Sequence, residues 1–281
     1  MTANEIKNIF AKYKLKPNKL LGQNFLIDQN ALTRIVKEGE ITKDDTILEV
    51  GPGLGVLTKE LVKAAGRVVA VEKDRELAEI LKKELADFKN LEIAEGDILK
   101  TNLSDYNLKA NNYKLIANIP YYLTSHLIRA FLEGESPKEI ILLIQKEVAE
   151  RICAAPPKMS LLAVSVQFYA DAAIIAPVSK NSFWPAPKVD SAIVKITPKD
   201  KNRPLANLAD FFSIVHAGFS HPRKQLAGNL SQALKINRQE VENVLKSFSF
   251  DPKQRAETLS IEDWIRLSEK FSTGDLSGSR D

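Results

Sequence analysis

Cysteine and histidine are scarce in this chain of 281 residues, which holds one cysteine, Cys153, and three histidines. A single thiol cannot form an internal disulfide or a paired-cysteine redox or zinc site. The histidines, His126, His216 and His221, lack the HxxxH or HExxH spacing by which two imidazoles reach one metal ion. The sequence therefore predicts neither a disulfide nor a metal site.

Long apolar runs are also missing. The run 140–144 has five residues, whereas a membrane-spanning helix needs about 20. Residues 1–5 are polar and lack the apolar core of a signal peptide. The hydrophobic fraction of 44% and the charged fraction of 27% are ordinary for a soluble globular protein. We therefore expect a cytoplasmic protein that does not associate with a membrane.

Positive charge is concentrated at the N-terminus. The net charge is +4, and the first twenty residues hold five lysines but a single acid, Glu5. Such an arm can contact a phosphate backbone, but it can equally be a solvated, disordered terminus, and composition alone leaves both open.

Short aliphatic runs alternate with helical spacing over the first 200 residues. The runs predict strands that alternate with helices, and such alternation is typical of a mainly parallel, doubly wound α/β sheet. Ligands of this fold class bind beyond the carboxyl ends of the strands. Strands are predicted at 47–50, 67–71, 91–94, 113–117 and 140–144, with an added antiparallel pair at 172–178 and 191–197.

Strand signals stop near residue 203. The remaining apolar spacing predicts helices at 211–219, 226–234, 241–248 and 261–271. The Gly/Ser-rich end predicts a disordered tail. Three parts are thus expected: 1–202 with the basic arm and the sheet, 203–271 as a helical domain, and 272–281 as the tail.

A glycine loop follows the first strand. The loop 51–55 reads G-x-G-x-G, Glu49 stands just before it, and Glu72 ends the next strand 21 positions after Gly51. This pattern suits any adenosine cofactor, since glycines allow close backbone approach and an end-of-strand acid can accept ribose hydroxyls. Three features favour S-adenosylmethionine: the spacing of the loop glycines, Glu49, and the later Gly96-Asp97. The carboxylate of Glu49 would attract the cationic groups of this cofactor and would repel the pyrophosphate of a dinucleotide.

The segment Asn118-Ile119-Pro120-Tyr121 ends the fourth predicted strand. It offers a side-chain carbonyl, a backbone carbonyl, a stiff turn and a flat ring, which together could hold an exocyclic amine and its base. A strand that ends in an ordinary proline turn explains four residues equally well.

Over nearly its whole length the chain resembles the bacterial small-subunit rRNA adenine N6,N6-dimethyltransferases. The similar segments are 21–26, 49–55, 118–121 and 183–191, with 219–224 and 255–260 in the helical part. The resemblance implies a class I S-adenosylmethionine-dependent methyltransferase sheet with a small helical C-terminal domain. It also implies a cofactor site formed by Asn24, Leu26, Glu49, Gly51, Gly53, Gly55, Glu72, Asp97 and Asn118.

The same resemblance implies the substrate. The family dimethylates two adjacent adenosines in a 3′-terminal hairpin loop of 16S rRNA, and here Asn118, Ile119, Pro120, Tyr121 and Phe183 are the expected catalytic residues. A base must leave its stack to react, and Tyr121 and Phe183 are the flat side chains expected to hold it.

Contacts to the rRNA are expected from Lys188, Arg223 and Lys224. The family often carries a longer basic run where His221-Pro222 stands, so the alternative for this segment is a solvated helix start. The expected partner is a small ribosomal subunit or its precursor, bound by a monomer.

Three rivals remain on sequence grounds. A DNA adenine methylase would share the base-binding segment but not the C-terminal helices. A non-catalytic RNA-binding or assembly factor does not need an intact Asn118 and Glu72. An NAD oxidoreductase needs a hydride-handling site, for which the sequence offers no candidate.

Overall fold

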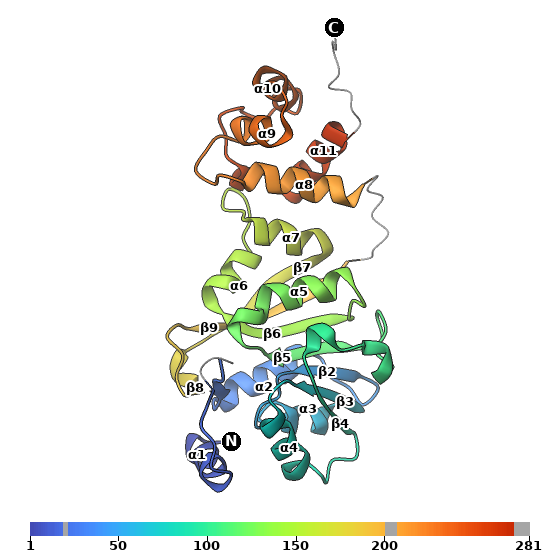
Figure 1. Cartoon of the computed structure of the whole chain (residues 1–281), viewed down its shortest axis with the longest axis vertical. Helices are drawn as coiled ribbons and strands as arrows, with labels where there is room; N and C mark the ends of the chain where they lie inside the picture. Colours follow the sequence, from blue (N-terminus) through green and yellow to red (C-terminus); the bar gives the residue numbers. More distant parts are fainter. Residues whose placement is uncertain (19–21, 200–206, 273–281) are drawn as a thin grey trace. The chain divides into compact units, whose positions relative to one another are not determined.

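A computed structural model describes residues 1–18, 22–199 and 207–272. Contacts divide the chain into two compact units, the first formed by 1–150 and 170–199 and the second by 151–169 and 200–281. The first unit contains a seven-stranded sheet (Figure 1) with the strands β2 Thr46–Val50, β3 Arg67–Glu72, β4 Leu91–Glu95, β5 Lys114–Asn118, β6 Glu139–Gln145, β7 Ala170–Val178 and β9 Ser191–Pro198.

The strand order is β4-β3-β2-β5-β6-β9-β7. The five strands from β4 to β6 are parallel, whereas β9 pairs antiparallel with both β6 and β7. The predicted α/β class, the mainly parallel sheet and the added antiparallel pair are therefore confirmed. The order reverses between β2 and β5, so their carboxyl ends form the crevice in which such sheets bind ligands.

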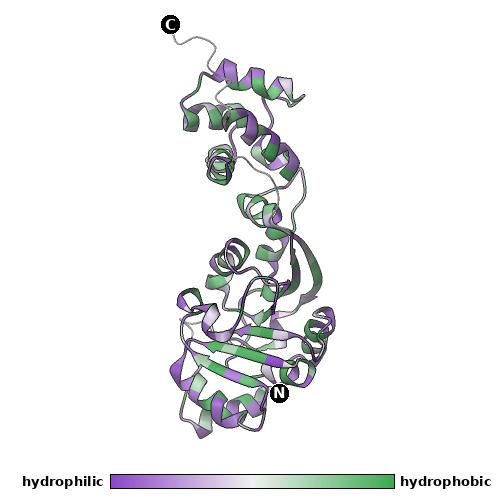
Figure 2. Cartoon of the chain, turned by 90° about the vertical axis from the view of Figure 1, so that its right-hand side faces the viewer, coloured by the Kyte–Doolittle hydropathy of each residue, from purple (hydrophilic) through white to green (hydrophobic). Residues whose placement is uncertain are grey.

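Helices pack on the sheet and bury its parallel strands, which is why these strands are nearly continuous apolar runs. α2 and α3 share a cluster with Ile47, Ile116 and Ile141, which lie on one face of the sheet, and the strands are correspondingly apolar in Figure 2. Asp74 caps α4 by accepting hydrogen bonds from two backbone N–H groups of its first turn. The helices of this unit are α2 Gln29–Glu38, α3 Thr58–Ala64, α4 Arg75–Glu84 and α5 Thr124–Glu133, and α6 Lys146–Ile152 crosses the unit boundary.

The basic N-terminal segment begins with an ordered helix, α1 Ala3–Lys12, so a wholly mobile or disordered arm is wrong for this part. Ile6 and Phe10 are buried against Phe25 and Leu77, while the two lysines of the helix, Lys7 and Lys12, are exposed. Residues 19–21 lie outside the described residues. The hydrophobic side of α1 therefore anchors the segment and leaves its charge exposed.

A two-stranded sheet forms from β1 Phe25–Leu26 and β8 Phe183–Trp184, which pair antiparallel in the register Leu26 to Phe183. Its position is fixed by Asp28, whose Oδ2 accepts a 2.7 Å hydrogen bond from the Ser182 hydroxyl. Short 3-10 helices complete the described chain: η2 Ile98–Lys100, η3 Leu103–Tyr106, η4 Tyr121–Leu123, η5 Lys180–Ser182 and η6 Ala256–Thr258.

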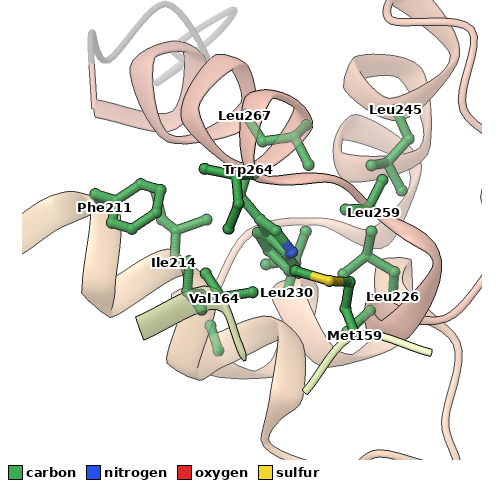
Figure 3. Close-up of a cluster of buried hydrophobic side chains, with 14 of the residues drawn as sticks. Met159, Val164, Phe211, Ile214, Leu226, Leu230, Leu245, Leu259, Trp264 and Leu267 are labelled. Atoms are coloured by element: carbon green, nitrogen blue, oxygen red, sulfur yellow. The ribbon is translucent and has the colours of Figure 1, made fainter. Parts of the chain in front are cut away.

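The second unit is helical, as predicted, with helices α7 Leu161–Tyr169, α8 Leu208–Phe219, α9 Leu226–Leu234, α10 Arg238–Ser247 and α11 Ile261–Ser272. Its core surrounds the fully buried Trp264 (Figure 3). No helix in the described ranges is long and apolar enough to cross a membrane.

A single domain boundary near residue 203 is wrong in one respect, because α7 belongs to the helical unit. Val164 and Phe168 of α7 pack in the same cluster as Phe211, so a helix that precedes β7 in sequence completes the second core. The expected boundary itself and the predicted tail from 273 onward lie outside the described residues.

Candidate active site

A cavity of about 380 Å³ opens at the carboxyl ends of the parallel strands. The turns after β2, β3, β4 and β5 all contribute to its wall, together with β1 and Phe183. Of the predicted cofactor and catalytic residues, the following line it: Asn24, Leu26, Glu49, Gly51, Gly53, Glu72, Asp97, Asn118, Ile119, Pro120, Tyr121 and Phe183.

Gly55 does not line the cavity, although a cofactor role was expected for it. Its φ of +78° and its lack of a side chain do serve packing, since a Cβ there would lie 2.6 Å from Leu81 Cδ1, and its cofactor role stays a prediction. The third glycine of the loop thus lets α4 approach the loop closely.

The glycine loop is tied to the acid that ends β3. The backbone N–H of Gly53 donates a 2.9 Å hydrogen bond to Glu72 Oε2, and the Asp74 N–H donates one of 2.9 Å to Oε1. Gly53 has a φ of +59°, and a Cβ would lie 2.9 Å from the Phe25 ring. Both oxygens of Glu72 keep free lone pairs, so this carboxylate can still accept hydroxyl groups from the cavity.

Glu49 is buried at 1% exposure in the same cavity. Burial, with a smaller contribution from the charge of Glu72, raises its pKa to about 8. Burial also raises the pKa of Glu72, but two N–H donors stabilise the ionised form there. Glu49 Oε2 has no hydrogen-bond partner within the described residues. Glu49 is therefore the carboxyl of this pair that carries a proton.

Asp97 follows β4 at the other side of the cavity. Its Oδ2 lies 2.9 Å from Lys73 Nζ, and its Oδ1 accepts the N–H of Leu99. These contacts, the Lys73 hydrogen bond first, lower the pKa of Asp97. A carboxylate so held offers further lone pairs to an amine in the cavity.

Asn118 closes β5 with its amide group oriented. The Nδ2 group donates a 3.2 Å hydrogen bond to the backbone carbonyl of Asn24. Asn118 also lines the cavity, and this bond does not use Oδ1, which can still accept a hydrogen bond. This bond links the cofactor segment around β1 to the segment expected to bind a base.

Tyr121 and Phe183 both border the cavity, but their settings differ. Tyr121 is partly buried, and its hydroxyl lies 2.8 Å from Ser191 Oγ. Phe183 is only 3% exposed and belongs to the core around Leu26. Phe183 therefore has two roles, as a core residue and as part of the cavity wall.

The three predicted RNA-contacting residues are exposed: Lys188 in the first unit, and Arg223 and Lys224 in the second. Within the described ranges none of them forms an ion pair. Their charges are thus available to phosphates.

The cavity also contains residues that the sequence reasoning missed. Among them are Tyr122, which is 54% exposed, and the exposed Leu99. Lys73 and His126 also line the cavity. Tyr122 follows a motif residue directly and Leu99 lies two positions after Asp97, so proximity to the motifs was the available signal.

Comparison with known proteins covers nearly the whole chain. A model of the ribosomal RNA adenine dimethylase family matches residues 14–273. A ribosomal RNA small subunit methyltransferase A of Dehalococcoides mccartyi is 41% identical over 270 residues, which cover 95% of this chain and 93% of that protein. The protein of that name from Clostridioides difficile is 40% identical over 277 residues, 96% of either chain.

The similarity to solved structures also covers most of the chain. A dimethyladenosine transferase from Plasmodium falciparum superposes with a TM-score of 0.76 at 28% identity, over 89% of this chain and 98% of that one. The 23S rRNA methyltransferase ErmE gives a TM-score of 0.70 at 28% identity, over 89% and 100%. The similarity therefore extends well beyond a shared cofactor-binding core.

Proposed function

Because the chain belongs to the ribosomal RNA adenine dimethylase family, we propose that it dimethylates N6 of two adjacent adenosines in a 3′-terminal hairpin loop of 16S rRNA. The observation that carries the proposal is the oriented amide of Asn118 in one cavity with Glu72 and Asp97. Support for the small subunit comes from relatives about 40% identical that are named ribosomal RNA small subunit methyltransferase A. We infer that the enzyme acts on a small ribosomal subunit or its precursor, as a monomer in the cytoplasm.

The cavity residues fit S-adenosylmethionine. Glu49 has a buried carboxyl oxygen that meets no hydrogen-bond partner in the described part of the chain, which suits a cationic ligand, and the backbone at Gly51 and Gly53 has no side chain to keep a ligand away. We assign Glu72 to ribose hydroxyls and Asp97 to the adenine of the cofactor, with Asn24 and Leu26 at its side. When bound, S-adenosylmethionine supplies an electrophilic methyl group.

Asn118 and Ile119 prepare the adenine amine. Its lone pair is delocalised into the ring, so the enzyme must localise and aim it. Asn118 Oδ1 and the Ile119 carbonyl can each accept one amine N–H, and these acceptors also stabilise the positive charge that develops on nitrogen. The hydrogen bond to Asn24 fixes which end of the Asn118 amide faces the cavity. The cationic amine then loses its proton readily, so no strong general base is required.

Tyr121 and Phe183 supply flat faces for the extruded base, and Pro120 stiffens the turn between Tyr121 and the amine-binding carbonyls. Stacking on an aromatic side chain contributes about 1 to 3 kcal/mol per base, comparable with the cost of unstacking. We assign Lys188, Arg223 and Lys224 to phosphates of the rRNA, which fix register rather than read sequence.

The test is transfer of labelled methyl groups to unmodified small subunits, large subunits and duplex DNA in parallel. We expect labelling of small subunits. Labelling of large subunits alone would support methylation of 23S rRNA, the activity that the name of ErmE gives for that protein. Labelling of DNA alone would support a DNA adenine methylase. A protein that binds small subunits but labels none of the three would be an assembly factor.

A further inference from the structure

Ser191 is a buried polar residue whose hydroxyl contacts the hydroxyl of Tyr121, the proposed base-binding residue. It is the first residue of β9, is 0% exposed, and lies in register with Gln145 of β6 and Val178 of β7. A strand paired on both sides gives this serine a fixed backbone. Its Oγ lies 2.8 Å from Tyr121 Oη, which is hydrogen-bond distance between two hydroxyls.

Tyr121 is held at its other end as well. The buried Thr124 donates a 3.1 Å hydrogen bond from its hydroxyl to the Tyr121 backbone carbonyl. The residue is therefore anchored at its carbonyl and at its phenol, by two buried hydroxyls from different elements. Two anchors fix the direction in which the ring points along the cavity wall, whereas an unanchored ring at a cavity can change rotamer.

We propose that Ser191 is a positioning residue of the methyl-transfer reaction, which holds the Tyr121 ring in the orientation that stacks on the target adenine before the base arrives. The inference rests on the proposed role of Tyr121. Its physical basis is preorganisation, since a misplaced supporting group lowers the fraction of bound substrate that is ready to react. Burial raises the pKa of Tyr121, so its phenol keeps its proton near neutral pH and both hydroxyls can serve as donor or acceptor.

The alternative is that the hydroxyl pair only stabilises the fold. A structural role would lower the free energy of unfolding without changing turnover per folded molecule. A positioning role lowers kcat, because the base rests in a poorer pose. It leaves KM for the subunit nearly unchanged, because contacts to the rest of the rRNA set the binding of the particle.

The experiment compares Ser191→Ala, Tyr121→Phe and the double variant with Ser136→Ala. Ser136 is a matched control, because it is a buried serine of the same unit whose hydroxyl has no partner within the described residues and does not line the cavity. Thermal unfolding, cofactor affinity, kcat and KM are measured with unmodified small subunits.

We expect kcat to fall about tenfold in each single variant, with KM within about twofold. The double variant should lose no more than either single variant, because both remove the same hydrogen bond. Turnover of Ser191→Ala equal to that of Ser136→Ala would overturn the inference, and so would losses that multiply in the double variant. Tyr121→Ala separates the role of Tyr121 from the role of Ser191. Full turnover of Tyr121→Ala would contradict the proposed base-stacking role of Tyr121. An inactive Tyr121→Ala together with a fully active Ser191→Ala would contradict only the positioning role of Ser191.

Discussion

Asn118 has its amide orientation set by the protein itself. The Asn24 carbonyl accepts the Nδ2 hydrogen bond, so no reorganisation is needed when an amine enters the cavity. Acceptors fixed in advance are more effective in catalysis than acceptors that must turn.

Glu49 lines the same cavity and carries a proton in the folded chain. A cation bound nearby favours the ionised carboxylate, so a cationic ligand can restore the negative charge of Glu49.

Asn118→Ala should reduce methyl transfer to small subunits by at least about 100-fold, by analogy with the loss of one preorganised oxyanion-hole group. Cofactor affinity should stay measurable by calorimetry, because Glu72 and Asp97 remain. Asn181→Ala, at an exposed asparagine of the same unit, is the control. Unchanged turnover of Asn118→Ala would remove the proposed role.

Glu49→Gln should change the pH dependence of stability. Below pH 4.5 Glu49 is protonated in both states, whereas between 4.5 and about 8 only the folded chain keeps the proton. The folded state then binds more protons, so the free energy of unfolding falls as pH rises through this window and levels off above it. The variant should lose the part of this decline that Glu49 contributes, which is on the order of a few kcal/mol, and keep the part from Glu72, whose pKa burial also raises.

Chemical denaturation of both proteins across this pH range measures the difference. Wild-type cofactor affinity should also rise with pH toward 8, because the ionised carboxylate attracts the cation, and the variant should show no such rise. Glu95→Gln, an exposed acid outside the cavity wall, should behave like wild type. Parallel stability curves for Glu49→Gln and wild type would contradict the assignment.

At the scale of elements, α1 and the β1–β8 pair join the cofactor side to the base side of the site. Phe10 of α1 contacts the rings of Phe25 and Trp184, with centroid distances of 5.5 and 5.8 Å. The same small sheet carries Leu26 and Phe183. The N-terminal helix therefore supports both walls of the cavity from outside it.

Phe10→Ala should lower the free energy of unfolding by about 3 kcal/mol, as is usual when a buried aromatic ring is removed. It should also weaken cofactor binding, because Phe25 loses a ring partner next to the cavity. Calorimetry and thermal unfolding test both effects. Asn8→Ala, on the exposed side of α1, should stay within about 0.5 kcal/mol of wild type.

The sequence predicted those strands, helices and turns whose pattern lies within a short stretch of the chain. Continuous aliphatic runs such as 140–144 identify buried parallel strands, and glycines and acids after them mark the ligand end of the sheet. α1 was missed because the lysine excess of the first twenty residues drew attention to charge, although Thr2 and Glu5 form a capping box that is readable in sequence. The Tyr121–Ser191 contact and the β1–β8 pairing join residues 70 or more positions apart, and no local pattern encodes such contacts.

At the scale of the whole molecule, two units have separate cores. The helical core depends on close packing at Gly218, where a Cβ would lie 2.3 Å from Trp264 Cη2. Trp264 is fully buried and cannot move aside. The sheet unit contains the whole cavity wall, so damage to the helical core should spare cofactor binding.

Gly218→Ala should therefore destabilise the helical unit by about 3 kcal/mol through overpacking. Gly228→Ala is the matched control, since among the described atoms its Cβ would meet only Arg238 Nη1, at 3.9 Å, and it should stabilise α9 by up to about 1 kcal/mol. Calorimetric unfolding and cofactor titration of both variants test this. Equal stability of the two variants would contradict the packing argument.

The central claim is dimethylation of adenosine in the small ribosomal subunit. Its most direct test is mass spectrometry of nucleosides from unmodified small subunits that were incubated with the enzyme and S-adenosylmethionine. We predict N6,N6-dimethyladenosine at two adjacent positions of the 3′-terminal hairpin loop, and none with Asn118→Ala. Methylation of another base, or of large-subunit RNA alone, would contradict the account.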